Sequence, residues 1–467
     1  MAYRPFFCIY FVFYLRRCGL RVVRRIGRRK IMLEAEQLIE RLNNGVAPQF
    51  VVLDALDQLV DEGFEVLSME KPWNLQAGGK YIVNQHDSSL VAFSMPDKIL
   101  DEESLAKRLE KANPFLRIAA AHTDYPALRI KATPDMKTGV YGKINTEVYG
   151  GAINPTWMDR PLGVAGRVSL KSEDVFAPRT VLYQSDRPVL IIPNLAIHMN
   201  REVNKGIELN PQKDMLPLFT TDVEKHTFVD FLAEELEVSK EEILDFELTC
   251  FATEQAEYVG VTEDMISSPR IDNISSVESC IYGLLDAGET DHLNMAVLFD
   301  HEEIGSRSNK GAASAFLRDL VEKIFVSIGV SSEMVISAIY QGMTISADVA
   351  HAYHPNYPDK EDVTNQPVLN GGFCIKEASS QSYATDAEAI SIVEQICKKN
   401  KITYQKFVNR SDLRGGSTLG AISSALLPMK TVDVGIPILA MHSARELMGK
   451  EDIHSLNQLI SAFFKEA

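Results

Sequence analysis

The chain has 467 residues, of which 45% are apolar and 24% are charged, so its composition is that of a globular protein and excludes a disordered or fibrous one. No uninterrupted apolar run approaches the roughly 20 residues that a membrane-spanning helix needs. Forty-eight basic residues against 64 acidic ones give a net charge of −16, which argues against nonspecific nucleic-acid binding, because such binding depends on Lys and Arg.

The first 31 residues differ in charge from the rest of the chain. They contain nine basic residues and no acidic one, so the remainder has 48 − 9 = 39 basic and 64 acidic residues and a net charge of −25. The apolar stretch 6–15 precedes most of the arginines, whereas a secretory signal has its positive charges first. We expect residues 1–31 to be a basic N-terminal arm. It is either an artefact of a start assigned upstream of Met32, or a disordered, targeting or membrane-surface segment.

From residue 32 onward, helical and strand patterns alternate, as is typical of α/β proteins. Helices are predicted at 32–45, 55–67, 273–286 and 453–464, and strands at 115–121, 293–299, 343–346 and 434–441. Between 135 and 250 the pattern changes to short β-favouring runs, at 164–170, 180–183 and 189–192, separated by Gly, Pro and Asp turns. We therefore predict an α/β catalytic domain, residues 32–134 and 251–467, interrupted by a β-rich domain, residues 135–250.

The six cysteines are scattered along the chain, without a C-x-x-C pair or the spacing of a disulfide framework. Buried as thiols, they would serve as small apolar side chains. This usage indicates a reducing compartment, and we expect the protein to be cytoplasmic.

Polar residues follow the predicted strands or begin the predicted helices at five places: His122 with Asp124, Asp272, Glu302 with Glu303, Asp348, and His442. Singly, each has an ordinary structural explanation, such as Asp272 capping the helix that follows it. Together they suffice for a two-metal hydrolytic site, because two Zn²⁺ ions roughly 3.5–4 Å apart need His and carboxylate ligands with a bridging carboxylate. On an extended strand, Asp124 lies on the same side as His122 and can accept the second imidazole N–H. Of two adjacent glutamates, one can bind metal while the other acts as general base.

These residues lie in motifs that resemble the M18 metallopeptidases, the aspartyl aminopeptidases among the di-zinc aminopeptidases. The motifs are AHTDYP at 121–126, DN at 272–273, FDHEEIGS at 299–306, DVAHAYHPN at 348–356 and AMHSARE at 440–446. The resemblance extends from about residue 35 to the C-terminus, so the basic arm lies outside it. It implies a three-layer zinc-exopeptidase domain with a mixed sheet, and a β-rich domain that serves in dimerisation and substrate gating.

The resemblance also implies a role for each residue of the five clusters. His122, Asp272 and Asp348 would hold one zinc, and Asp272, Glu303 and His442 would hold the other, with Asp272 as the bridge. Glu302 would be the general base, and Asp124 would orient His122.

Four further residues are implied to contact substrate. Lys376 would lie near the pocket for an acidic N-terminal side chain, although a solvated surface lysine is the alternative. Gly416 and Ser417 belong to a glycine loop that would lie beside the substrate, and this loop lacks the pattern of a phosphate-binding loop. His198 would reach into the site of a neighbouring subunit, although a structural histidine is the alternative.

We expect a di-zinc aminopeptidase that releases acidic N-terminal residues from peptides. Mn²⁺ or Co²⁺ could replace Zn²⁺, because they accept the same ligands. Two alternatives are a related di-metal aminopeptidase of neutral or broad specificity and a catalytically silent assembly protein on the same scaffold. The resemblance implies a homo-oligomer, a dimer that builds a dodecamer, and we expect neither a nucleic-acid partner nor an integral membrane segment.

Overall fold

The computed structural model describes residues 29–413 and 415–466, so the predicted basic arm lies almost entirely outside the described residues. The chain forms two compact units. The α/β unit comprises Lys30–Pro126, Tyr149–Thr156 and Glu254–Ala467, and the β unit comprises Ala127–Val148 and Trp157–Thr253. Among the described residues, no helix combines the length and the apolarity that crossing a bilayer requires.

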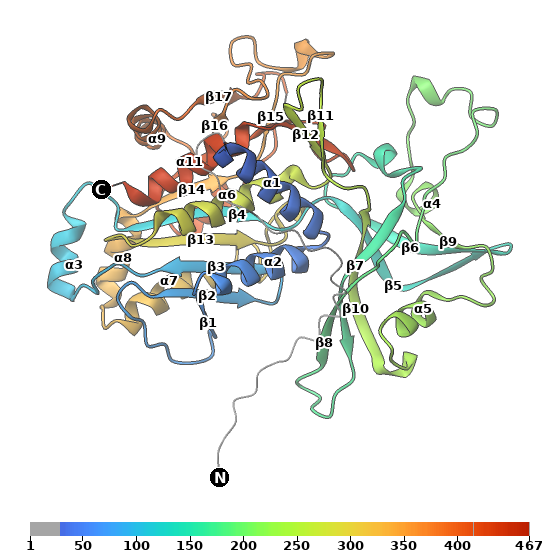
Figure 1. Ribbon diagram of the computed structural model, residues 1–467, viewed down its shortest axis with the longest axis horizontal. Helices are drawn as coiled ribbons and strands as arrows, with labels where there is room; N and C mark the ends of the chain where they lie inside the picture. The colour runs from blue at the N-terminus through green and yellow to red at the C-terminus, as the bar shows by residue number, and fades with distance from the viewer. Residues whose placement is uncertain (1–28, 414, 467) are drawn as a thin grey trace. The chain divides into compact units, whose positions relative to one another are not determined.

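A nine-stranded mixed sheet forms the centre of the α/β unit (Figure 1). In spatial order its strands are β1 (Glu65–Leu67), β2 (Lys80–Gln85), β3 (Ser89–Ser94), β13 (Leu293–Phe299), β4 (Leu116–His122), β14 (Met343–Ala347), β18 (Lys430–Gly435), β16 (Phe373–Glu377) and β17 (Tyr404–Val408). The neighbours β13, β4, β14 and β18 are parallel, so their carboxyl ends meet at one edge. Every residue of β4 and β13 is buried, which explains their continuous apolar runs.

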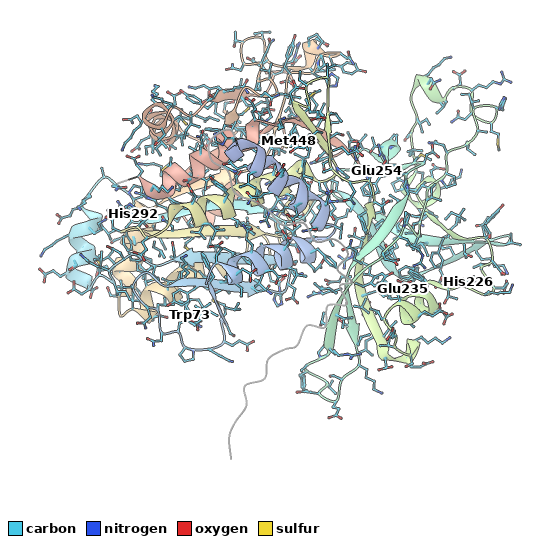
Figure 2. The ribbon with its side chains drawn as sticks, viewed as in Figure 1. Trp73, His226, Glu235, Glu254, His292 and Met448 are labelled. Carbon is cyan, nitrogen blue, oxygen red and sulfur yellow. The ribbon has the colours of Figure 1, made fainter. Side chains whose placement is uncertain are left out.

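Helices cover both faces of this sheet and complete a three-layer arrangement. One core packs between the sheet and α1 (Arg29–Asn44), α2 (Pro48–Asp61), α6 (Ile271–Ala287), α9 (Ala387–Asn400) and α11 (Asp452–Lys465). The other core includes residues of α3 (Glu102–Leu109), α7 (Phe316–Ser327), α8 (Ser332–Gln341) and α10 (Leu419–Leu426). Side chains of β4 alternate between the two cores, with Ala119 in the first and Ile118 in the second. Met448 of the first core and Trp73 of the second are labelled in Figure 2.

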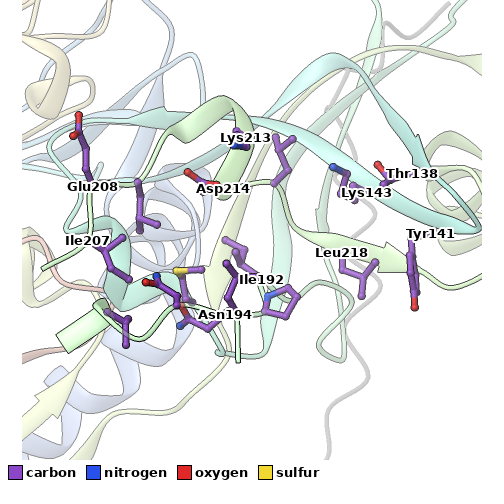
Figure 3. Close-up of a pocket in the computed structure, with 17 residues that line it drawn as sticks. Thr138, Tyr141, Lys143, Ile192, Asn194, Ile207, Glu208, Lys213, Asp214 and Leu218 are labelled. Atoms are coloured by element: carbon purple, nitrogen blue, oxygen red, sulfur yellow. The ribbon is translucent and has the colours of Figure 1, made fainter. Parts of the chain in front are cut away.

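Two further sheets complete the fold. The smaller one belongs to the α/β unit and contains β11 (Glu257–Val259), β12 (Met265–Ser268), β20 (Glu446–Gly449), β19 (Pro437–Leu439) and β15 (Ala350–His351). The β unit is built on β8 (Arg179–Gln184), β7 (Leu162–Leu170), β10 (Ile243–Ala252), β5 (Ala127–Thr138), β6 (Tyr141–Tyr149) and β9 (Leu218–Thr220), with the short helices α4 (Pro211–Asp214) and α5 (Phe228–Glu235). A cavity of ≈ 740 Å³ in this unit is lined by apolar side chains such as Ile192, Ile207 and Leu218 (Figure 3).

Three of the predicted elements are wrong. The helix predicted at 55–67 is α2, which starts earlier with Pro48 in its first turn; a turn at Gly63, with φ of 85°, then leads into β1. The strand predicted at 434–441 is two strands, β18 and β19, which belong to different sheets. The run 189–192 makes isolated β-bridges instead of a strand.

Candidate metal centre

The carboxyl edge of the main sheet carries four of the predicted site residues. His122 is the last residue of β4, and Asp348 directly follows β14. Glu302 and Glu303 follow β13 in the short 3₁₀ turn η4 (Glu302–Ile304), after His301 with φ of 64°. Because β13, β4 and β14 are parallel neighbours, these side chains arrive at the same place.

Two more site residues come from outside the main sheet. Asp272 lies at the start of α6, where Asp272 and Asn273 have non-helical backbone angles and the peptide bond between them is cis. His442 lies after β19 with φ of 65°. The buried carboxylate of Glu446 holds both backbones, because it accepts the N–H of Asp272 at 3.0 Å and the N–H of His442 at 2.8 Å.

The structure brings all six residues together. Three groups have one ligand atom from each member within 4.8 Å of the others: His122, Asp272 and Asp348; Asp272, Glu303 and His442; and His122, Glu302 and Glu303. Nε2 of His122 lies 3.6 Å from Oδ1 of Asp272, and Nε2 of His442 lies 3.3 Å from its Oδ2. Asp272 therefore presents one oxygen to each imidazole. Nε2 of His122 is also 3.5 Å from Oδ1 of Asp348, and Nε2 of His442 is 3.4 Å from Oε2 of Glu303.

Asp124 has more contacts than the sequence predicts. Nδ1 of His122 lies 3.0 Å from the backbone oxygen of Asp124 and 3.5 Å from its carboxylate. The two carboxylate oxygens accept the backbone N–H groups of Glu302 and Glu303, each at 3.1 Å, and the hydroxyl of Tyr149 at 2.7 Å. One buried carboxylate thus fixes the turn that carries both glutamates as well as contacting the histidine.

Burial and neighbouring charges shift the pKa values of the clustered carboxyl groups. Burial raises the pKa of Glu302 to about 8, and the carboxylates of Asp348 and Asp124 add to the rise against the effect of His122. Burial also raises the pKa of Glu303 well above its usual value, with Asp272 as the next cause. Burial acts in the same direction on Asp348, but Lys376 and His122 outweigh it and lower the pKa of that carboxyl to about 2.

The cluster fits divalent metal ions on two grounds. Oδ1 of Asp272 and Oε1 of Glu303 are buried and have no hydrogen-bond partner among the described residues. Buried carboxylate oxygens normally have a hydrogen-bond donor or a cation beside them. Imidazole nitrogens and carboxylate oxygens are also ligands that Zn²⁺ takes in proteins. Cations would therefore satisfy both the orphaned oxygens and the crowded negative charge.

A cavity of ≈ 100 Å³ at this cluster is lined by three of the four predicted substrate residues. Lys376, Gly416 and Ser417 line it together with the six clustered residues. Lys376 is buried, so it is not a solvated surface lysine. His198 is exposed and belongs to the β unit, so its predicted role in a neighbouring subunit stays a prediction.

The sequence interpretation missed Glu446 as a site residue, although this glutamate is in the motif at 440–446. Since a glutamine can accept only one of the two N–H groups, we expect Glu446→Gln to lower the free energy of unfolding by about 1.5–3 kcal/mol. Urea unfolding measures this loss. Glu322→Gln, an exposed position in α7, is the matched control. Equal midpoints for both variants would show that Glu446 does not hold the two backbones.

The α/β fold and the cluster are those expected of a metal-dependent hydrolase. Residues 42–464 match the family model of the aminopeptidase I zinc metalloproteases (M18). The chain therefore belongs to the M18 family, whose members are zinc aminopeptidases. The predictions of this family, of a metallo-aminopeptidase and of a three-layer fold with a mixed sheet are confirmed.

Curated relatives and solved structures agree with this membership. The probable M18 family aminopeptidase 2 of Clostridium novyi (strain NT) is 42% identical over 421 residues, which cover 89% of this chain and 95% of that protein. The protein of the same name from Clostridium acetobutylicum is 39% identical over 435 residues, covering 92% of this chain and 98% of that protein. In the cryo-EM structure of the Ape4 and Nbr1 complex, a chain 31% identical matches with a TM-score of 0.87, covering 93% of this chain and 86% of that chain.

Proposed function

We propose that this chain is a two-zinc aminopeptidase that prefers peptides with an acidic N-terminal residue. The observation that carries the two-metal part is the position of Asp272, whose two carboxylate oxygens lie near two different imidazoles. Such a bridging carboxylate is what two metal ions a few ångströms apart require. In this proposal His122, Asp272 and Asp348 hold one ion, and Asp272, Glu303 and His442 hold the other.

When bound, two divalent cations would lower the pKa of a water molecule and polarise the scissile carbonyl. The chain supplies the proton transfer. Glu302 lines the cavity and lies outside both groups that share Asp272, so its carboxylate is available to take a proton from the attacking water and return it to the leaving amine. Its backbone N–H donates to Oδ1 of Asp124, which fixes the turn that carries Glu302.

The preference for acidic residues rests on Lys376. Its Nζ donates to the backbone oxygen of Val349 at 2.8 Å, lies 3.7 Å from Oδ2 of Asp348, and lies 4.7 Å from the centre of the Tyr383 ring. The ammonium is therefore fixed at the wall of the cavity. A fixed cation favours binding of a substrate carboxylate. Because Asp348 already neutralises part of the positive charge of Lys376, a neutral or broad specificity is the second candidate.

Substrate comparison separates these two specificities. We expect kcat/KM for Asp- and Glu-p-nitroanilide to exceed that for Leu-p-nitroanilide by about tenfold or more, corresponding to roughly 1.4 kcal/mol of preferential binding. Lys376→Met should bring the ratio of kcat/KM for the Asp substrate to that for the Leu substrate close to one. Lys398→Met, at an exposed position, should keep the wild-type ratio. A wild-type preference for Leu would contradict the acidic assignment.

The proposal includes a homo-oligomer, a dimer that builds a dodecamer, in the cytoplasm. One solved structure with the same fold, at 24% identity and a TM-score of 0.78, is described as the dodecamer of mApe1 from S. cerevisiae. Light scattering tests this part of the proposal on its own. A mass near the 52.1 kDa of one chain would contradict it.

A further inference from the structure

The segment Tyr149–Thr156, called the strap here, contacts the candidate metal centre from an unexpected part of the chain. It groups with the α/β unit, although the residues directly before and after it belong to the β unit. Its backbone N–H at Ile153 donates to the backbone oxygen of His442 at 3.0 Å. The hydroxyl of Thr156 accepts the N–H of Ala444 at 2.9 Å. The strap is thus bound along the turn that carries His442.

The strap also determines which nitrogen of His442 carries its proton. Nδ1 of His442 lies 3.1 Å from the backbone oxygen of Gly151. A carbonyl oxygen only accepts hydrogen bonds, so Nδ1 of a neutral His442 must be the protonated nitrogen. Nε2 then directs its lone pair toward Asp272 and Glu303, as a metal ligand must.

The strap approaches so closely because it has glycines at two positions. A Cβ on Gly151 would lie 3.2 Å from Nδ1 of His442. A Cβ on Gly150 would lie 3.1 Å from Cβ of Glu303, and the φ of Gly150 is +72°. Larger residues would displace the strap from both ligands or displace the ligands themselves.

Tyr149 connects the strap to the other side of the centre. Its hydroxyl donates to Oδ2 of Asp124 at 2.7 Å, and the same oxygen accepts the backbone N–H of Glu303 at 3.1 Å. The centre of the Tyr149 ring lies 6.3 Å from that of the His301 ring, beside the turn of the glutamates.

We propose that Tyr149 and Gly151 are positioning residues for the metal ion held by Asp272, Glu303 and His442. The inference rests on the proposed two-metal function. Gly151 acts through the tautomer and placement of His442, and Tyr149 acts through Asp124 and the backbone of Glu303. Among the described residues, neither His122 nor Asp348 forms a hydrogen bond with Gly151, so Gly151→Ala should weaken one metal affinity more than the other.

Metal titration of the full-length protein tests this inference. Metal-free wild type, Gly151→Ala and Tyr149→Phe are titrated with Co²⁺, and the visible absorption of each equivalent is recorded. Gly151→Ala should bind one equivalent as wild type does and the second about 10–100-fold more weakly, with an altered spectrum for the second. Excess metal should restore its activity. Tyr149→Phe should also bind the second equivalent more weakly than wild type, by a smaller factor than Gly151→Ala does.

The control is Tyr258→Phe, which removes a buried hydroxyl of the α/β unit that has no hydrogen-bond partner among the described residues. It should bind both equivalents as wild type does. If Gly151→Ala and Tyr149→Phe also bind both equivalents with wild-type affinity and spectra, the inference is overturned. If wild type itself binds fewer than two equivalents, the proposed two-metal function fails instead.

Discussion

Glu302→Gln is expected to lower kcat/KM by about 10²–10⁴-fold, the range that a general acid–base residue contributes. Glutamine has the same size and keeps the contacts of the backbone, but its amide cannot take a proton from water and return it to an amine. Oε2 of Glu302 lies 4.0 Å from Nε2 of His122, in the same cavity as the ligand candidates. Steady-state kinetics on an aminoacyl-p-nitroanilide, with zinc analysis of the same preparation, measure both consequences.

The zinc content of Glu302→Gln shows whether Glu302 is a general base or a metal ligand. We expect wild-type zinc content with the activity lost, because Glu302 lies outside the two groups that share Asp272. Loss of zinc would instead make Glu302 a ligand, in the third group with His122 and Glu303. Retained activity would contradict the proton-transfer role. Glu322→Gln in α7, an exposed position, controls for the loss of one carboxylate.

Asp272→Asn is expected to remove both zinc ions and reduce kcat/KM at least as much as Glu302→Gln. Asparagine retains the size of the side chain but loses the charge and one of two carboxylate oxygens, and those oxygens face different imidazoles. Both groups that share Asp272 would therefore lose a ligand by a single substitution. Zinc per chain after dialysis against a weak chelator measures the loss.

Variants of the other ligand candidates distinguish a bridging Asp272 from an ordinary ligand. Asp348→Asn should weaken the binding of one zinc ion and leave the binding of the other unchanged, since Asp348 belongs to one group alone. Asp61→Asn, at an exposed position at the end of α2, should leave zinc and activity unchanged. An Asp272→Asn variant that loses a single zinc, as Asp348→Asn does, would contradict the bridging role.

The four parallel strands β13, β4, β14 and β18 of the main sheet and most of the site could be predicted from the sequence for a physical reason. Strands buried on both faces, such as β4 and β13, require continuous apolar runs, and the residues at their carboxyl ends are brought together by parallel pairing. His122 and the glutamates at 302 and 303 follow such runs directly. Asp272 could be placed because α6 has a clear helical pattern after it.

Other features leave a weaker trace in the sequence. β1 has three residues with mostly exposed side chains, so nothing in its pattern separates it from the helix before it. The bend between β18 and β19 occurs within one apolar run, and both strands are largely buried. Gly151 acts through a backbone oxygen, which every residue type has, so its role becomes visible only from the contact with His442.

In the proposed function, one chain holds two zinc ions at a centre bridged by Asp272 and uses them to release N-terminal residues. The most direct measurement titrates zinc into metal-free wild-type protein and follows bound zinc and aminopeptidase activity together. We predict that binding saturates at two zinc ions per chain and that activity is complete only at the second. Saturation at one zinc per chain, or full activity in the metal-free protein, would contradict the claim.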